Sequence, residues 1–230
     1  MSTDVRDSEV AWDEAPSGPA RPNPLLITLI AVAVAIALVL AGLIGHLVNQ
    51  PSSDSSVMAT SASVDAGFAR DMSTHHQQAI TMAGYTRDNT TDPAIKVLAT
   101  DIETGQEFQV GEMQGWLDTW GLSRNSPTPM SWMVGHSLEP DGLMPGLATP
   151  AQMARLESSH GKALDILFLQ LMIHHHQGGV VMAKYAADNA KISYVRDLAG
   201  SMYTTQSNEI VQMGQLLLKL GGSQLPPPSD

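Results

Sequence analysis

Residues 65–89 read DAGFARDMSTHHQQAITMAGYTRDN, and residues 165–189 read DILFLQLMIHHHQGGVVMAKYAADN. The two segments align without a gap at an offset of one hundred, and both contain a His-His-Gln triplet with a methionine three residues before it. Identities continue, more sparsely, to Gly121 and Gly221. Self-similarity at a fixed period indicates a duplicated structural unit. The sequence therefore predicts two repeat units, 64–121 and 164–221.

Each repeat unit has the pattern of a helical hairpin. Apolar and histidine side chains recur at steps of three and four residues, as on one face of a helix. A stop and a restart follow at Asp88–Pro93, and Gly121 marks the end of the second helix. Two hairpins that are each apolar on one side bury that side by packing together. We predict an all-α fold, a four-helix bundle at 64–221 whose two hairpins are joined by a crossover loop at 122–150.

A long apolar run precedes the predicted bundle. Leu25–Val48 contains no Asp, Glu, Lys or Arg, and at about 1.5 Å per residue it is long enough to cross a hydrocarbon core of about 30 Å. Its length and the lack of a clear small-residue cleavage site favour an uncleaved signal anchor. Arginines precede the run, whereas no Lys or Arg follows it before Arg70, which predicts a cytoplasmic N-terminus and an extracytoplasmic bundle.

The chain is therefore expected to be a single-pass protein of the cell membrane. Its predicted parts are a cytoplasmic tail (1–24), a transmembrane helix (25–48), a flexible linker (49–63), the bundle (64–221) and a disordered tail (222–230).

Composition excludes several classes of function. Twelve Lys and Arg against 23 Asp and Glu give a net charge of −11, which argues against a nucleic-acid partner. The absence of cysteine excludes disulfides, thiolate nucleophiles, iron–sulfur clusters and thiolate-ligated zinc. Thirteen methionines and eight histidines remain, so a metal site in this chain would depend mainly on imidazole and thioether ligands.

The candidate metal ligands are paired histidines with a methionine one helical turn earlier. Met72, His75 and His76 lie at i, i+3 and i+4 and are neighbours on one helix surface. Folding the hairpin back brings Met113 near the level of Met72, and the second unit repeats the arrangement. The predicted metal-binding residues are Met72, His75, His76, Met113, Met172, His175, His176 and Met213, with Met82, Met182 and His174 as further candidates.

The softness of these ligands indicates the metal. Imidazole binds several first-row metals, whereas thioether selects copper, above all Cu(I). Zinc prefers histidine with carboxylate or thiolate, and a ferritin-type di-iron centre needs Glu-x-x-His on two helices, a spacing found here only at Glu157–His160. A chain with 5% aromatic residues gives no positive sign of haem. Copper, with Cu(I) favoured, is the predicted metal.

A structural interpretation of the same residues stays open. Methionine fills gaps in helical cores, and buried histidine can hydrogen-bond to Gln or Asp. The alternative function is a non-catalytic accessory or scaffold module of a membrane complex. The crossover loop also carries Met130, Met133, His136 and Met144, but their spacing in a proline-rich segment fixes no geometry.

These motifs resemble a known family. The signature Met72-x-x-His75-His76-Gln77, its counterpart at 172–177 and the segment Met144-Pro145-Gly146-Leu147 are similar to the domain of unknown function 305 (DUF305) family, over about residues 64–221. The resemblance implies a ferritin-like four-helix bundle, exported or membrane-anchored, with copper binding in some members. The chain departs from the family's pattern at Leu147, where methionine is frequent. It also has a Gly-Gly pair at 178–179, which is expected to loosen the helix after its histidines.

The sequence thus predicts a membrane-anchored extracytoplasmic protein that binds or sequesters copper and is not an enzyme. Its predicted partners are the metal ion and the membrane, and the sequence identifies no protein partner. Because an imidazole of ordinary pKa titrates near about 6.5, copper affinity is expected to fall below about pH 6. The helices of the metal-free bundle are expected to survive that acidification.

Overall fold

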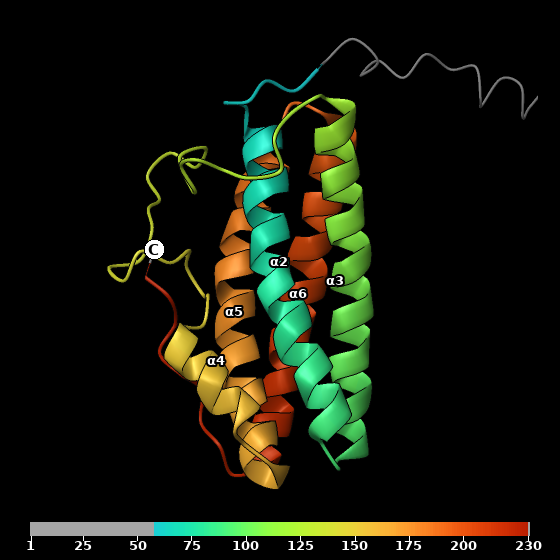
Figure 1. The fold of residues 1–230 in the computed structure, drawn as a ribbon, viewed down its shortest axis with the longest axis vertical. Coiled ribbons are helices and arrows are strands. Elements are labelled where there is room, and N and C mark those ends of the chain that lie inside the picture. Colours follow the sequence, from blue (N-terminus) through green and yellow to red (C-terminus); the bar gives the residue numbers. More distant parts are fainter. Residues whose placement is uncertain (1–57, 230) are drawn as a thin grey trace, which may run out of the picture. The chain divides into compact units, whose positions relative to one another are not determined.

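The computed structural model describes residues 58–229. Four long helices, accompanied by one short one, run alongside each other, and no strand occurs in this part of the chain (Figure 1). The long helices are α2 (Val64–Asn89), α3 (Pro93–Thr119), α5 (Gly161–Asn189) and α6 (Ser193–Lys219), and the short one is α4 (Pro150–Glu157). A helical bundle is therefore confirmed.

The predicted transmembrane segment, the tail before it and most of the linker lie outside the described residues. Within residues 58–229, none of the helices combines the length and apolar character that a membrane span requires.

The turns of the two hairpins are capped differently. Asp92 accepts hydrogen bonds from the backbone N–H groups of Ala94 and Ile95 at 2.8 and 3.2 Å, and so caps the start of α3. At the equivalent position of the second unit Ile192 has no polar side chain to do this. There, Asp65 at the start of α2 accepts from the N–H groups of residues 191 and 192, at 3.0 and 2.8 Å.

The equivalent aspartate of the second unit makes a reciprocal contact. Asp165, near the start of α5, accepts a 2.6 Å hydrogen bond from the hydroxyl of Thr90, in the turn between α2 and α3. The first helix of each hairpin is thus held against the turn of the other hairpin. The two contacts are equivalent in position and fix the antiparallel alignment of α2 and α5.

The hairpins meet through α2 and α5. Buried apolar side chains form two clusters, which contain different methionines. The first cluster includes Met72, Met113 and Met182, and the second includes Met82, Met172 and Met213. Because α2 and α5 are antiparallel, each cluster takes methionines from both repeat units.

The crossover loop is fixed to α2 by a buried carboxylate. Asp71 accepts hydrogen bonds from the backbone N–H of Met130 at 2.7 Å and from the indole N–H of Trp132 at 2.8 Å. Burial raises the pKa of Asp71 above its usual value, and these hydrogen bonds oppose that rise. Met130, Met133 and Met144 are all buried, so the methionines of this loop belong to the core.

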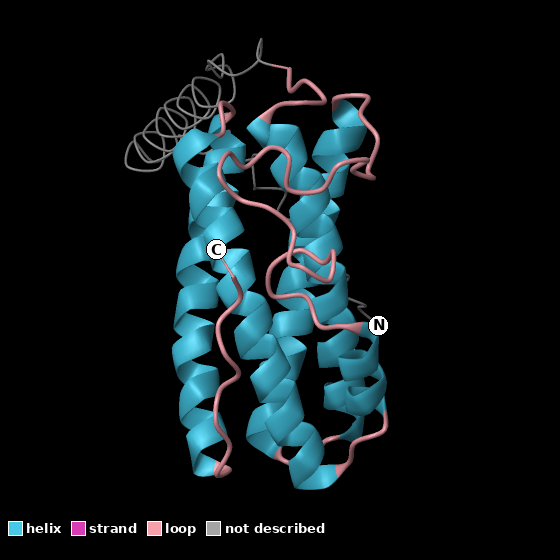
Figure 2. Cartoon of the chain, turned by 90° about the vertical axis from the view of Figure 1, so that its left-hand side faces the viewer, coloured by secondary structure: helices cyan, strands magenta, loops and turns pink. Residues whose placement is uncertain are grey.

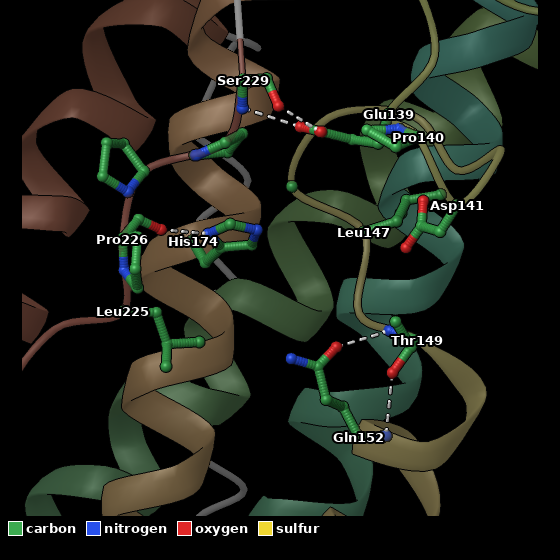
Figure 3. A pocket seen from close by; sticks show the side chains of 13 residues that line it. Glu139, Pro140, Asp141, Leu147, Thr149, Gln152, His174, Leu225, Pro226 and Ser229 are labelled. Carbon is green, nitrogen blue, oxygen red and sulfur yellow. Dashed lines mark hydrogen bonds between the residues drawn. The ribbon is translucent and has the colours of Figure 1, made fainter.

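The C-terminal tail, which the sequence predicts to be disordered, runs along the helices (Figure 2). The side-chain amide of Gln170 donates to the carbonyl of Ser223 at 2.7 Å, and the imidazole of His174 contacts the carbonyl of Pro226 at 2.9 Å. At its end, the backbone N–H of Ser229 donates to Glu139 at 2.8 Å. These contacts border an open pocket of about 410 Å³ between the tail and the crossover loop (Figure 3).

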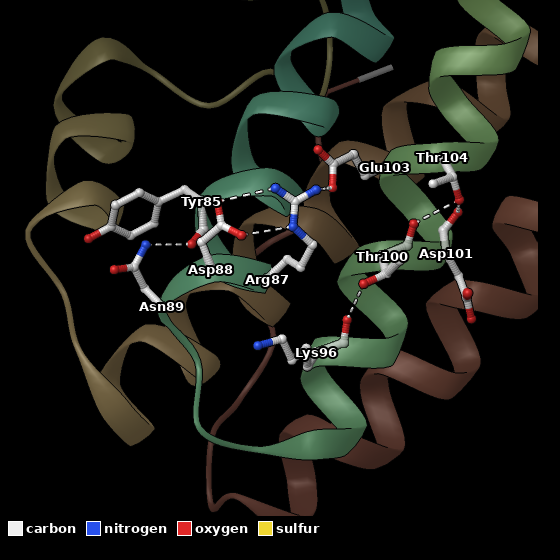
Figure 4. A network of polar contacts seen from close by, with 9 residues as sticks. All are labelled: Tyr85, Arg87, Asp88, Asn89, Lys96, Thr100, Asp101, Glu103 and Thr104. Atoms are coloured by element: carbon white, nitrogen blue, oxygen red, sulfur yellow. Dashed lines mark hydrogen bonds and ion pairs between the residues drawn. The ribbon is translucent and has the colours of Figure 1, made fainter.

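A network of polar side chains joins the C-terminal end of α2 to the N-terminal half of α3 (Figure 4). Arg87 forms ion pairs with Asp88, at 2.9 Å, and with Glu103 on α3. The Arg87–Asp88 pair is exposed, and such pairs contribute about 0–1 kcal/mol to the free energy of unfolding. The side chain of Glu103 is only 13% exposed, so water screens its pair with Arg87 less.

Candidate metal centre

Four histidines, two from each repeat unit, lie completely buried where α2 and α5 pack together. We call His75, His76, His175 and His176 the histidine quartet. The rings of His75 and His175 are in contact, with centroids 3.8 Å apart, and those of His175 and His176 are 6.0 Å apart. The closest ring contact thus joins the two units.

One nitrogen of each central histidine is bound to a backbone carbonyl. The Nε2 of His75 lies 3.0 Å from the carbonyl oxygen of Pro145, and the Nε2 of His175 lies 2.9 Å from that of His75. A carbonyl oxygen can only accept, so each Nε2 must carry the proton. In a neutral ring, Nδ1 then has a free lone pair.

The outer histidines are anchored in the same way by side chains of the neighbouring helices. His76 Nε2 lies 2.8 Å from Oε1 of Gln109 on α3, and His176 Nε2 lies 2.8 Å from Oε2 of Glu209 on α6. Each partner follows its histidine by 33 residues. All four imidazoles are thus oriented by Nε2.

The four Nδ1 atoms are buried and, among the described residues, none has a hydrogen-bond partner. A buried acceptor without a partner costs about 1–3 kcal/mol, so four of them in one place call for an explanation. In metal-binding histidines the second ring nitrogen typically donates to a carboxylate or a carbonyl, which fixes the tautomer and directs the other nitrogen to the metal. In the quartet, Nε2 is the nitrogen bound to a carbonyl or carboxylate oxygen, and Nδ1 is the nitrogen left without a partner.

Burial also keeps three of these imidazoles, those of His75, His76 and His175, neutral. It lowers the pKa of His75 to about 4 and that of His76 to about 3, and it holds the pKa of His175 well below its ordinary value. Repulsion by the neighbouring imidazoles acts in the same direction. Near neutral pH these three rings are in the form that binds a metal.

The predicted methionine ligands are distributed on both sides of the quartet. Met72 and Met113, which the sequence predicts to lie close together, are in the first core cluster. Met172 and Met213, the corresponding pair of the second unit, are in the second cluster. All four are fully buried. The further candidates Met82 and Met182 are also buried, but each lies in the cluster of the opposite repeat unit.

His174 is separate from the quartet. It is half-buried, and its Nδ1 contacts the carbonyl of Pro226 in the C-terminal tail (Figure 3). The structure therefore places it on the outer side of α5, away from the buried imidazoles.

The quartet fits a soft metal ion better than a hard one. Within residues 58–229, no three or more His, Asp and Glu side chains form a ready-made cage for a metal. A centre here would combine imidazole with the buried thioethers, and that donor set suits copper rather than zinc or iron.

The two glycines after the second histidine pair do not interrupt α5, which continues to Asn189. A Cβ on Gly178 would lie 2.0 Å from the carbonyl oxygen of Pro145, the same atom that accepts from His75. A Cβ on Gly179 would lie 2.4 Å from the side chain of Gln206. These glycines therefore allow the close approach of the crossover loop and of α6, instead of loosening the helix.

Sequence reasoning missed the anchors of the quartet. The carbonyl of Pro145 has no signature in the sequence, because every residue has a carbonyl. Gln109 and Glu209 did have a signature in the sequence. They occupy equivalent positions of the two units, and each follows its outer histidine by 33 residues.

The family described as a domain of unknown function (DUF305) matches residues 65–217. The chain belongs to the DUF305 family. The match includes all four long helices and the whole quartet. An uncharacterized protein of Acanthamoeba polyphaga mimivirus, L153, is 43% identical over 54 residues, a match that covers 24% of this chain and 36% of that relative.

Solved structures of DUF305 proteins have the same fold. One from Streptomyces coelicolor is 42% identical, with a TM-score of 0.67 over 73% of this chain and 98% of the other. CopM in its Cu(II)-bound form is 28% identical, with a TM-score of 0.53 over 67% of this chain and 96% of CopM. CopM in its Cu(I)-bound form also has 28% identity and a TM-score of 0.53, over 69% and 98% of the two chains.

Proposed function

We propose that this DUF305 protein binds and sequesters copper at the histidine quartet and its flanking methionines, without catalysing a reaction. The observation that carries the proposal is the set of four buried Nδ1 atoms without partners, on rings whose Nε2 atoms are all anchored. Histidines that served only the core would be expected to use both nitrogens.

The relatives support copper as the metal. CopM, which shares the fold and more than a quarter of the aligned residues, has been solved with Cu(II), with Cu(I) and with silver. In this chain, buried imidazole and thioether side chains provide the ligands that such soft ions prefer. These side chains would bind the ion and exclude water from it.

Burial favours storage over turnover. The four imidazoles have no exposed surface, so an ion held among them is out of reach of a second substrate. Release would require the helices to separate or the crossover loop to move. This is suited to a protein that retains copper.

The membrane anchor is a part of the proposal that rests on the sequence. The apolar run at 25–48 would hold the bundle at the extracytoplasmic side of the cell membrane, where copper is buffered before it reaches the cytoplasm.

The test is an anaerobic titration of the full-length protein with Cu(I) in competition with a chelator. Replacing His75 and His76 together by Gln should lower the stoichiometry or the affinity, and replacing His175 and His176 as well should abolish tight binding. Circular dichroism checks that each variant is folded. A folded four-fold variant that binds Cu(I) as tightly as the unmodified protein would refute the proposal and favour a scaffold role for the bundle.

A further inference from the structure

The two repeat units place different charges on the quartet. The outer histidines make hydrogen bonds of the same length, 2.8 Å, to residues at equivalent positions. In the first unit that residue is Gln109, which is neutral, and in the second unit it is Glu209, which carries a carboxylate. The outer histidines of the two units therefore have matching hydrogen bonds, but only that of the second unit has a charged partner.

The carboxylate contacts a fully buried ring. The side chain of Glu209 is 21% exposed, whereas that of His176 is 0% exposed. Water screens the negative charge only in part at such a position, so it acts more strongly on the quartet than a surface charge would.

The same carboxylate borders a small polar cavity between α3 and α6. The cavity has a volume of about 30 Å³, enough for one or two water molecules, and is lined by Asp101, Gln106, Gln109, Gln206 and Glu209, among others. Gln106 and Gln206 are at least nine-tenths buried, and their side-chain carbonyl oxygens have no hydrogen-bond partner among the described residues. The carboxylate of Glu209 thus lies beside a space that can hold water close to the quartet.

A cation among neutral imidazoles needs a compensating charge. Placing an uncompensated charge in a protein interior is costly, and a nearby opposite charge reduces the cost. The attraction between a carboxylate and a cation grows in proportion to the cation's charge. A carboxylate beside the quartet therefore favours a divalent ion over a monovalent one.

We propose that Glu209 determines which oxidation state of copper the centre retains, by stabilising Cu(II) relative to Cu(I). The inference rests on the proposed copper binding and adds to it a specificity determinant on one repeat unit only. Glu209 acts through His176 and through its charge, and is not itself assigned as a ligand.

The test exchanges Gln109 and Glu209, the hydrogen-bond partners of the outer histidines. Glu209→Gln removes the charge but keeps the hydrogen bond, since Gln109 already makes the same bond to His76. Gln109→Glu adds the charge to the other unit. The double variant restores the total charge with the two residues interchanged. Affinities are measured for Cu(II), for Cu(I) under anaerobic conditions, and for Ag(I) as a monovalent probe that does not change its oxidation state.

Glu209→Gln should weaken Cu(II) binding by roughly tenfold more than Cu(I) or Ag(I) binding, because one additional unit of charge interacts by nearly 3RT across roughly 10 Å at an effective dielectric constant of about 20. Gln109→Glu should shift the Cu(II)/Cu(I) affinity ratio in the opposite direction, and the double variant should return it towards the original. Each tenfold change in that ratio raises or lowers the reduction potential of bound copper by about 59 mV, which voltammetry measures independently.

Asp101→Asn is the matched control. It removes a carboxylate that lines the same cavity but is exposed to solvent, where water screens its charge, so it should change the affinity ratio much less than Glu209→Gln does. Equal losses of Cu(II) and Cu(I) affinity in Glu209→Gln, or no loss of either, would overturn the inference while copper binding itself stands. If the unmodified protein binds neither Cu(II) nor Cu(I), the proposed copper-binding function is itself refuted.

Discussion

At the scale of single residues, the centre depends on which nitrogen of each imidazole is occupied. Pro145, His75, Gln109 and Glu209 each bind one Nε2, and the four Nδ1 atoms are left over. A histidine placed to complete the core would use both nitrogens. The substitutions that test the ligands therefore need to remove donor atoms while preserving volume.

Replacing Met72 and Met172 by leucine is such a change. Leucine is close to methionine in volume, so each substitution should cost less than about 1.5 kcal/mol of stability. If thioethers bind the ion, Cu(I) affinity should fall more than Cu(II) affinity, because sulfur prefers the softer ion. Chelator competition under anaerobic and aerobic conditions measures the two. Equal losses for both ions would argue against thioether ligands.

At the scale of elements, the crossover loop approaches α5 closely at Gly178, where a Cβ would have less room than at any other glycine of the described residues. Helix propensity alone would make Gly178→Ala stabilising by about 1 kcal/mol. The structure reverses that sign, because the new Cβ would lie 2.0 Å from the carbonyl oxygen of Pro145, and a rigid backbone atom cannot give way cheaply.

We therefore expect Gly178→Ala to lower the free energy of unfolding by about 1–3 kcal/mol, as measured by chemical denaturation. It should also weaken copper binding, since it displaces the carbonyl that orients His75. Gly200→Ala on α6 is the control: nothing lies within 4 Å of its Cβ, so it should be neutral or stabilising. Similar effects of the two substitutions would contradict the close approach.

Sequence reasoning could locate the helices and the four histidines, because their spacing repeats with the period of a helix and again at an offset of one hundred. It could not assign Met182 to the cluster of Met72, since that grouping depends on the antiparallel packing of two hairpins and not on spacing within one. The Pro145 carbonyl was also out of reach, because its position depends on the path of a loop with no regular pattern. The lowered pKa values follow from burial, which the sequence does not measure.

At the scale of the whole molecule, burying the quartet makes the metal-free bundle sensitive to acid. In the unfolded chain a histidine takes up a proton near pH 6.5, whereas in the folded protein the pKa values of His75 and His76 are about 4 and about 3, and that of His175 is lowered as well. Between about pH 6.5 and 4 the unfolded state therefore binds more protons, and stability falls as the pH falls. Above about pH 6.5 this contribution is complete.

Three such histidines should together reduce the free energy of unfolding by roughly 3–4 kcal/mol between pH 7.5 and 5.5, at about 1.4 kcal/mol per pH unit for each. Denaturation curves of the metal-free protein at the two pH values measure this, and His76→Gln should remove about a third of the difference. The buried carboxyls of Asp71 and Asp165, whose pKa values are raised, act in the opposite direction at lower pH. Identical curves at both pH values would contradict the prediction.

The lowered histidine pKa values change the expected pH dependence of copper binding. An ordinary imidazole would begin to lose copper below about pH 6, but the buried rings stay neutral to lower pH in the folded protein. Copper affinity should therefore be flat on acidification until the bundle itself unfolds. Measuring copper affinity and circular dichroism on the same samples shows whether copper binding and helical structure are lost at the same pH.

The hydrogen bond from His175 to the backbone of His75 joins positions one hundred residues apart, in the two repeat units. A gene encoding a single hairpin could build this core only as a pair of identical subunits. In such a pair every substitution occurs twice, so negative charges can be added to the centre only in even numbers. A single chain that contains both units is free of that constraint, and the single carboxylate of Glu209 is a charge that no symmetric dimer of hairpins could carry.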